Sequence, residues 1–339
     1  MINLRTLAAR LPIDPYLVLL IATVVTAALL PARGSGQSMA EAAVIAAVAL
    51  LFFLYGARLS AKAVWTGVAH WRLQSLTFAS TFVLFPLVGL AVATVMRPYL
   101  PHDILVGLVY LCLLPSTVQS SIAFTSIARG NVPAALCSAS LSNLAGVFLT
   151  PLLVSLLLPA AGVGISAHAL GDIALQILLP FVLGQIARPW IYDWLQRHPV
   201  LTAVVDRGSV LLVVYAAFSA GMVAGVWTQL SLGDLAAVVA LDLAMLALVI
   251  VSMTLLTRRL GFSTPDEIAI VFCGSKKSMA GGIPMATILF PGHAVGMIVL
   301  PLMLFHQAQL FVCATLARRY ATRATDRIET RQVATAVFA

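Results

Sequence analysis

Long apolar segments are the feature that most constrains the fold of this chain. A helix needs about 20 mostly apolar residues to cross a bilayer, and such segments follow one another from residue 13 to residue 317. Backbone groups in lipid must be satisfied within the protein, which leaves helices or closed barrels, and the short alternating strands of a barrel are absent from the sequence. We therefore predict an all-α polytopic membrane protein. Its ten transmembrane helices are expected at about 13–31, 38–57, 72–96, 103–128, 133–158, 168–190, 207–229, 234–256, 267–290 and 294–317.

The composition excludes several other classes of protein. Charged residues make up 9% of the chain, against about 25% in soluble domains, and cannot cover a soluble particle of this size. The formal charge of +8 comes from basic residues scattered between apolar runs, so no nucleic-acid partner is predicted and the lipid bilayer is the expected surroundings. The four cysteines form no CxxC pair, which argues against a disulfide framework or a zinc site.

The basic residues also predict an orientation. With the N-terminus in the cytoplasm, 16 of the 20 Lys and Arg residues fall in cytoplasmic segments and only Arg33 and Arg97 fall outside. This positive-inside bias predicts an even number of spans in a bacterial-type inner membrane, with both termini cytoplasmic. The apolar run from Tyr16 to Leu30 could be a signal peptide, but its length and the runs after it favour a first span. Residues 321–339 are expected to form a frayed cytoplasmic tail.

The spans divide into two halves. A loop at 162–168 separates five spans from five within a single unit of about 1–320, with repeats at about 13–159 and 168–320. Because five is odd, two halves of the same fold would enter the membrane from opposite sides, as in many secondary transporters. In that arrangement the binding site lies at interrupted helices near the bilayer midplane.

Both halves contain an interrupted segment in their fourth span. Pro115 opens a hydroxyl-rich stretch in the first half, and Gly274 to Pro284 surround two lysines in the second. Proline removes a helical hydrogen bond and glycine loosens the backbone, so the freed groups need protein, water or a ligand as partners. For the serines alone, small-residue helix packing is the competing interpretation. The candidate substrate- and ion-binding residues are Ser116, Thr117, Gln119, Ser120, Ser121, Ser138, Ser142, Asn143, Ser275, Lys276, Lys277, Ser278, His306 and Gln307.

The segment PSTVQSSIAFTSIARGNVPAALCSASLSNLAGVFLTP, from Pro115 to Pro151, resembles the fourth and fifth spans of the bile acid:sodium symporter superfamily, and FCGSKKSMAGGIPMATILFP resembles the ninth. The chain is most similar to the SBF-like branch, which includes the vertebrate seventh-member subfamily and bacterial proteins. The resemblance implies a ten-helix fold with a panel and a core domain. It also implies that helices 4 and 9 are discontinuous and cross, that access alternates, and that the substrate is a small organic anion.

The sequence departs from the pattern of sodium-coupled members. The resemblance implies sodium-binding oxygens in a Ser-Asn pair, in a Glu and a Gln of the ninth span, in hydroxyls of the fifth, and in a Gln of the third. Here Ser121 replaces the Asn, Thr81 stands at the third-span position, and no Glu or Gln occurs between Ile268 and Phe290. Several positions therefore lack the usual oxygen donors, and two lysines stand at the crossing instead.

A lysine at the centre of a membrane helix costs at least about 2.5–3.5 kcal/mol, so Lys276 and Lys277 require an explanation. One hypothesis is that an ammonium group occupies the place of a sodium ion, and another is that a lysine binds the acidic group of an organic anion. The competing interpretation is that both snorkel or face water at a helix end. The sequence leaves the coupling ion open between sodium, protons and none, and predicts no other cofactor.

Asp242, in the middle of the eighth predicted span, is a candidate proton- or ion-coupling residue. A protonated structural acid and a salt-bridge partner of a lysine are the two alternatives. An intramembrane enzyme is disfavoured because no HExxH motif occurs and this acid stands alone. A channel fits the inverted repeat less well than a carrier does. We expect a secondary active transporter, with a regulatory membrane protein affecting calcium homeostasis as the alternative.

Overall fold

A computed structural model describes residues 15–58, 70–158, 174–225, 230–291 and 293–337, and no strand occurs within these ranges. Helices are expected in a membrane protein, because the bilayer core offers no hydrogen-bond partners. A single segment that crosses it satisfies its own backbone N–H and C=O groups by forming a helix. The helices, with two short π-helical turns, are α2 Pro15–Leu29, α3 Ser35–Arg58, α5 Trp71–Ala79, η1 Ser80–Leu84, α6 Phe85–Met96, α7 His102–Leu113, α8 Gln119–Ile127, α9 Val132–Leu157, η3 Ala174–Leu178, α11 Leu179–Arg197, α12 Pro199–Val223, α13 Leu232–Arg259, α14 Thr264–Gly274, α15 Met279–Leu289 and α16 Val295–Val337.

The protein is an integral membrane protein by the length and composition of its helices. Six stretches of the described chain are long and apolar enough to cross a bilayer, and α7 and residues 18–29 are shorter apolar helices. The spans are Ser35–Arg58, Trp71–Met96, Val132–Leu157, Pro199–Val223, Leu232–Arg259 and Val295–Thr322.

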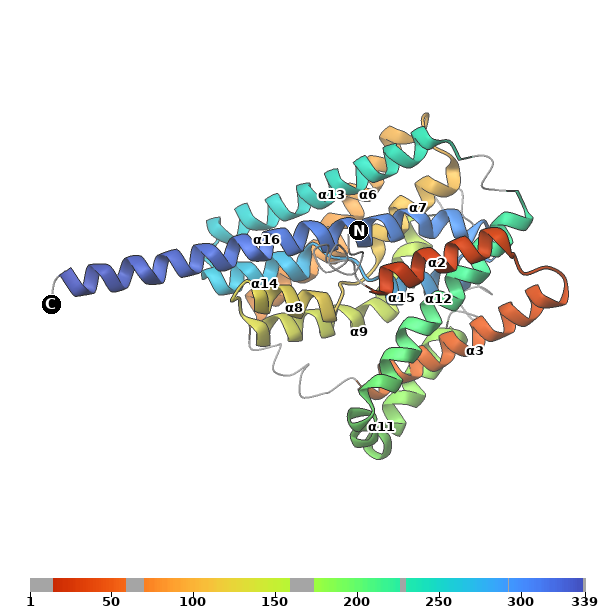
Figure 1. The fold of residues 1–339 in the computed structure, drawn as a ribbon, viewed down its shortest axis with the longest axis horizontal. Coiled ribbons are helices and arrows are strands. Elements are labelled where there is room, and N and C mark those ends of the chain that lie inside the picture. The colour runs from red at the N-terminus through yellow and green to blue at the C-terminus, as the bar shows by residue number, and fades with distance from the viewer. Residues whose placement is uncertain (1–14, 59–69, 159–173, 226–229, 292, 338–339) are drawn as a thin grey trace, which may run out of the picture.

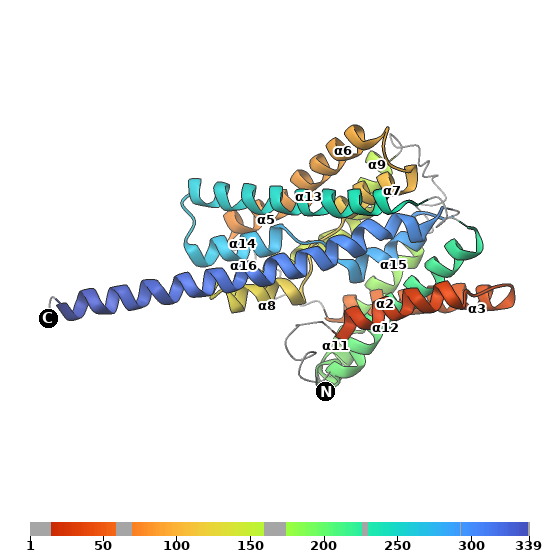
Figure 2. The same ribbon diagram turned by 45° about the horizontal axis from the view of Figure 1, so that its top comes forward.

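The helices pack in two groups (Figures 1 and 2). The panel group consists of α2, α3, η3, α11 and α12, and the core group consists of α5 to α9 and α13 to α16. Within the panel group, Gly56 and Gly184 let α3 and α11 approach closely, because a Cβ atom on either glycine would collide with a backbone carbonyl of the other helix. The two groups meet where α12 packs against α15 and α16.

Two interrupted helices meet inside the core group. The chain between α7 and α8 is extended around Pro115, and the chain between α14 and α15 is extended around Lys276 and Lys277. The backbone N–H of Ser278 donates to the carbonyl of Pro115 at 2.8 Å, so the two interruptions are in direct contact. The predicted breaks in these two segments are therefore present in the structure.

The C-terminal end of the described chain is helical. Helix α16 continues as one helix to Val337 and projects beyond the bundle (Figure 1), over most of the segment predicted to form a cytoplasmic tail. Residues 322–337 contain no glycine or proline to stop a helix that has already begun. The predicted boundary between the two halves, at 162–168, lies outside the described residues.

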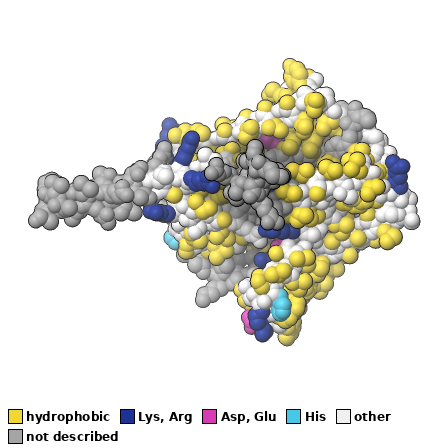
Figure 3. Space-filling model, in the orientation of Figure 1, with side chains coloured by type: hydrophobic (Ala, Val, Ile, Leu, Met, Phe, Trp, Pro, Cys, Tyr) yellow, Lys and Arg dark blue, Asp and Glu magenta, His cyan; other side chains and the backbone are white. Residues whose placement is uncertain are grey.

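The surface is consistent with burial in a membrane. Figure 3 shows apolar side chains over much of the described part of this face. Most of the visible Lys and Arg side chains lie toward the projecting end of α16 or near α11, and one group lies at the opposite end. Large exposed apolar residues occur along the helices, as expected where lipid is the solvent.

Candidate functional site

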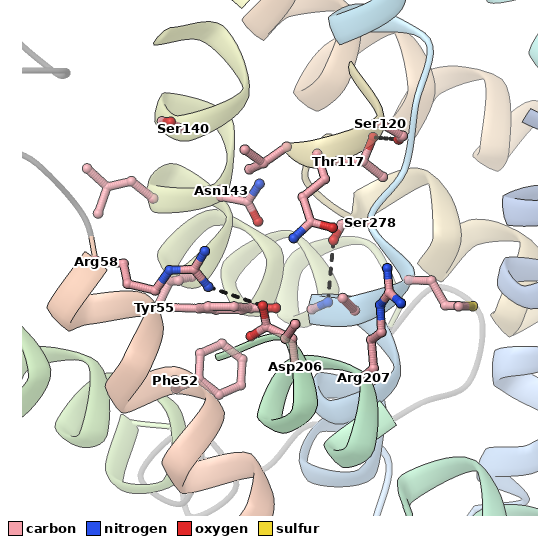
Figure 4. Close-up of a pocket in the computed structure, with 18 of the residues that line it drawn as sticks. Phe52, Tyr55, Arg58, Thr117, Ser120, Ser140, Asn143, Asp206, Arg207 and Ser278 are labelled. Atoms are coloured by element: carbon pink, nitrogen blue, oxygen red, sulfur yellow. Dashed lines mark hydrogen bonds and ion pairs between the residues drawn. The ribbon is translucent and has the colours of Figure 1, made fainter. Parts of the chain in front are cut away.

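A cavity of about 440 Å³ lies between the core group and the panel group. Apolar side chains such as Phe52, Val147 and Phe181 form part of its walls. Figure 4 shows polar side chains from the two groups facing each other across this space. The lining residues come from eight helices, α2, α3, α8, α9, α11, α12, α15 and α16, and from the two chain interruptions.

The core wall is built from the interruptions themselves. The predicted site residues that line the cavity are Thr117, Gln119, Ser120, Asn143, Ser278 and His306. Helices α8 and α15 both begin at this wall, and α8 has no side-chain cap, whereas Ser278 caps α15. The first N–H groups of a helix lack partners within the helix and carry a partial positive charge. This wall therefore favours an anionic group.

The panel wall carries charges that sequence reasoning assigned only to topology. Arg58 of α3 donates to Asp206 of α12 at 3.1 Å, and the guanidinium of Arg207 lies 5.4 Å from the centre of the Tyr16 ring. Figure 4 shows Asp206 between the two arginines. One acid beside two arginines leaves this wall with a formal charge of +1.

The opposite ends of the broken helices lie behind the core wall. Where α7 and α14 end, their last carbonyls lose their intrahelical donors. Side chains supply several of the replacements: Ser80 Oγ donates to Gly274, Ser116 Oγ to Cys273, Ser121 Oγ to Phe272, and Thr150 Oγ1 to Leu113. The interruptions are thus closed by hydroxyl groups of the protein, which holds the two breaks in fixed positions.

Another backbone carbonyl is freed in the π-helical turn η1, directly before α6. In the π-helical turn η1, the N–H of Phe85 bonds to the carbonyl of Ser80, five residues before it. The next residue, Pro86, has no N–H. The carbonyl of Thr81 therefore lacks a donor from either an α-helical or a π-helical bond. Such single-turn π-bulges are often found at functional sites.

Lys277 supplies the missing donor. Its fully buried ammonium group donates to the carbonyls of Thr81 at 2.9 Å, Cys112 at 2.7 Å and Leu114 at 2.8 Å. The ring centre of Phe85 lies 4.3 Å from the same Nζ atom. All three N–H bonds of the ammonium are used, and the cation lies at the negative, C-terminal end of α7.

Gln309 of α16 holds the backbone of this lysine. Its Oε1 accepts from the N–H of Lys277 at 2.9 Å, and its Nε2 donates to the carbonyl of Lys277 at 3.0 Å. The same Nε2 lies 2.8 Å from Nδ1 of His306, a cavity residue. A buried amide thus satisfies both backbone groups of the unwound residue and connects it to the cavity wall.

Comparison with known proteins identifies the family. Residues 14–322 match the SBF-like CPA transporter family. The chain belongs to this family. It is 54% identical to PA2026 of Pseudomonas aeruginosa over 92% of this chain and 94% of that protein, and 51% identical to "Putative symporter YfeH" of Escherichia coli over 96% and 97%. It is 28% identical to sodium/bile acid cotransporter 7 of the rat over 80% of each chain.

The resemblance to the SBF-like branch, inferred from the two interrupted segments, is confirmed by this match. The SBF-like CPA family is one of transporters, in agreement with the expectation of a transporter rather than an enzyme.

Other predicted site residues lie away from the cavity in this SBF-like protein. Gln307 is half-buried on α16 and does not line the cavity, and Lys276 and Lys277 are fully buried behind it. Ser138 donates to Gln74 at 2.7 Å, and Ser142 accepts from the N–H of Ser116 at 3.0 Å. Five of the predicted site serines are buried outside the cavity lining and bond to protein groups: Ser116, Ser121, Ser138, Ser142 and Ser275.

Asp242 of α13 is fully buried, and neither of its carboxyl oxygens has a hydrogen-bond partner among the described residues. Within the same ranges it forms no ion pair with a lysine, so the structure does not contain the salt bridge weighed as one of three interpretations. The SBF-like chain therefore carries a buried acid outside the cavity.

Sequence reasoning missed the panel wall. Arg58 and Arg207 were counted as topological charges, and Asp206 was not considered. The adjacent Asp206-Arg207 pair, at the start of a predicted span, is the signal that could have identified them, because an acid there can hold an arginine near the site.

Proposed function

We propose that this protein is a secondary active transporter that moves a small organic anion by alternating access. The ammonium group of Lys277 takes the place of the coupling sodium ion, so transport does not require sodium. The observation that carries the proposal is the set of three carbonyls that Lys277 Nζ binds at the meeting point of the broken helices. Carbonyl oxygens at short distance are also the ligands that a hard cation prefers.

The position of these carbonyls supports the substitution. The resemblance to sodium-coupled symporters places a glutamine at Thr81, whose carbonyl is one of the three acceptors. The rat relative is named for sodium and bile acid. In this chain the tethered ammonium would occupy these three carbonyls permanently, so a sodium ion would find neither space nor free ligands there.

The charge of the cavity supports an anionic substrate. Two helix N-termini begin at the core wall, and the panel wall carries a formal charge of +1 from Arg58, Asp206 and Arg207. Each N-terminus is equivalent to roughly half a positive charge. The apolar part of the lining would hold the body of an organic acid and exclude water from its charged group.

For the membrane arrangement, we propose ten spans as an inverted repeat of five plus five, with discontinuous fourth and ninth helices. Both termini would be cytoplasmic in a bacterial inner membrane. The matching interruptions around Pro115 and Lys276 support this layout, as does the bias of basic residues. The cavity lies between the panel and core groups, so movement of one group against the other would expose it to each side in turn.

Ligand-induced thermal stabilisation of purified protein would test the proposal. A panel of monocarboxylates and sulfonates, from acetate and benzoate to taurocholate, would be tested in potassium buffer and again in sodium buffer. We expect at least one anion to raise the melting temperature equally in both buffers. Arg97→Gln, which changes an exposed arginine outside the cavity lining, serves as a control and should respond like the wild type.

Flux assays in proteoliposomes would complete the test with the stabilising anion. Saturable uptake in sodium-free buffer would support a sodium-independent transporter. Strict dependence of uptake on sodium would contradict the role of Lys277. Anion binding without flux would favour the regulatory alternative.

A further inference from the structure

The two adjacent lysines lie in opposite environments. Lys277 Nζ has three carbonyl acceptors, whereas Lys276 Nζ has no hydrogen-bond partner among the described residues. Lys276 is equally buried and is surrounded by rings, with the centre of Phe124 at 4.0 Å and that of Phe272 at 5.7 Å. One lysine is held as a cation, and the other is held by side chains that offer no oxygen.

This difference has an energetic consequence. An ammonium group taken from water into an apolar site loses several kcal/mol of hydration, and a cation–π contact returns about 2 kcal/mol when desolvated. Phe124 and Phe272 belong to a small apolar cluster with Cys313 and Tyr320. The environment of Lys276 therefore tolerates the neutral amine far better than the environment of Lys277 does.

A chain of hydroxyl groups leads from the cavity toward Lys276. Thr117 and Ser120 line the cavity, and their oxygens lie 2.8 Å apart. Thr117 Oγ1 also lies 3.2 Å from Ser121 Oγ, which is fully buried and is next to the Cys273 thiol. Cys273 stands three residues before Lys276 in the chain, in the last turn of α14. Hydroxyl groups both donate and accept, so they can pass a proton along such a chain.

The titratable groups around Lys276 are few. Cys313 of α16 lies in the same cluster as Phe272, whose ring faces Lys276, and Cys273 of α14 stands three residues before Lys276 in the chain. Beyond Phe272 lies Tyr320 of α16, which donates to Glu267, and Glu267 is paired with Arg258 at 3.0 Å. Asp242 is buried on α13, a helix that packs against α14 and α16. An anion in the cavity would add a negative charge at the wall formed by Ser278, two residues from Lys276 in the chain.

We propose that Lys276 is the proton-binding group of the transport cycle and that one proton enters with each anion. The amine of Lys276 takes up a proton from cavity water by way of Ser120, Thr117, Ser121 and the thiol of Cys273, and becomes an ammonium while the anion is bound. It returns the proton by the same path when the anion leaves. Lys277 keeps its proton throughout. This inference rests on the proposed anion transport, and it assigns the coupling ion.

The experiment compares purified wild type with Lys276→Met, using Lys277→Met as a matched control, by melting temperature between pH 6 and pH 9.5 without any anion. An unfolded lysine carries a proton below about pH 10. If the folded wild type holds Lys276 as an amine, the unfolded chain binds one proton more, and stability rises with pH. Relative to Lys276→Met, the wild-type melting temperature should rise by on the order of 2 °C per pH unit.

Lys277→Met should melt at lower temperature but keep the wild-type slope, because Lys277 is an ammonium in both states. Equal slopes for wild type and Lys276→Met over the whole range would overturn the proposal. An apolar side chain should be tolerated where the lysine is a neutral amine, so Lys276→Met and Lys276→Leu should fold. Failure of both variants to fold would contradict the proposal. No anion is present in this experiment. A negative result would therefore contradict the role of Lys276 without deciding whether the protein transports an anion, which the flux assay tests.

Discussion

The Nζ atom of Lys277 lies 2.9 Å from the carbonyl oxygen of Thr81, a carbonyl that its own helix cannot satisfy. The π-helical turn and the missing N–H of Pro86 create this acceptor, and the end of α7 contributes two more. The three carbonyls replace the water molecules that an exposed ammonium group would bind. The contacts explain why a lysine can remain in the interior of a membrane protein.

Removal of this lysine should create a cation site. In Lys277→Ala the three carbonyls would face a small empty space without a donor, at about 1–3 kcal/mol for each buried group. We expect a large drop in melting temperature in potassium-free, choline-based buffer, with partial recovery on addition of sodium. A thermal unfolding series from 0 to 300 mM sodium chloride, with choline chloride at constant ionic strength, would measure the recovery.

Lys276→Ala is the control for this rescue. Its Nζ contacts no carbonyl, so its removal leaves no oxygen cage for sodium to fill. Recovery of both variants by sodium, or of neither, would show that the Lys277 carbonyls do not form a cation site.

Gln309 should matter through its amide and not through its size. Replacement by Leu would leave the N–H and the carbonyl of Lys277 without partners, at about 1–3 kcal/mol for each buried group. Gln309→Glu keeps an oxygen that can accept from the N–H of Lys277 but loses the N–H that donates to its carbonyl. It should therefore be less destabilised than Gln309→Leu. Chemical or thermal unfolding in detergent would rank the three proteins, and equal stability of Gln309→Leu and wild type would contradict this role.

The interrupted helices could be predicted because their signal is local. Pro115 removes an N–H at one break, and Gly274 with Ser275 begins the other, so composition alone locates both. The contacts of Lys277 could not be predicted. Its partners are backbone carbonyls, which every residue carries, and they become available only through a π-helical turn and a helix end brought together by folding.

The serines show the same limit. Ser116, Ser121 and Ser142 have the composition of a binding site, yet they close the chain breaks, whereas Thr117 and Ser120 from the same stretch face the cavity. Sequence spacing identifies a polar region but cannot separate the two faces of a segment that is not a regular helix. The arginines of the panel wall were missed because long-range packing, and not local pattern, directs them toward the cavity.

Arg207 should contribute to anion binding through its charge. Arg207→Gln removes the net positive charge of the panel wall, and the loss of one charge facing an anion typically weakens binding by about tenfold or more. Asp206→Asn removes the opposing acid and should strengthen anion binding. Affinity of the stabilising anion would be measured by thermal shift titration, with Arg97→Gln as the control for a change of net charge. Effects of the same sign in Arg207→Gln and Asp206→Asn would contradict the electrostatic explanation.

The closest approach of α3 and α11 gives a test of packing that is independent of the site. Gly56→Ala would put a Cβ against the carbonyl of Phe181, and Gly184→Ala would put one against the carbonyl of Phe53. Because backbone atoms cannot rotate away, the helices must separate, which costs typically 1–3 kcal/mol for overpacking. Gly36→Ala is the matched control, since Gly36 lies in the same helix α3 with open space around it and should be neutral or slightly stabilised.

The double variant Gly56→Ala/Gly184→Ala distinguishes helix separation from local adjustment. If the first alanine already moves α3 from α11, the second finds room, and the double variant should lose less stability than the two single variants together. Thermal unfolding of the four alanine variants beside wild type would give the coupling. Strict additivity would mean that each alanine is accommodated locally, and an unchanged melting temperature in Gly56→Ala would contradict the close approach itself.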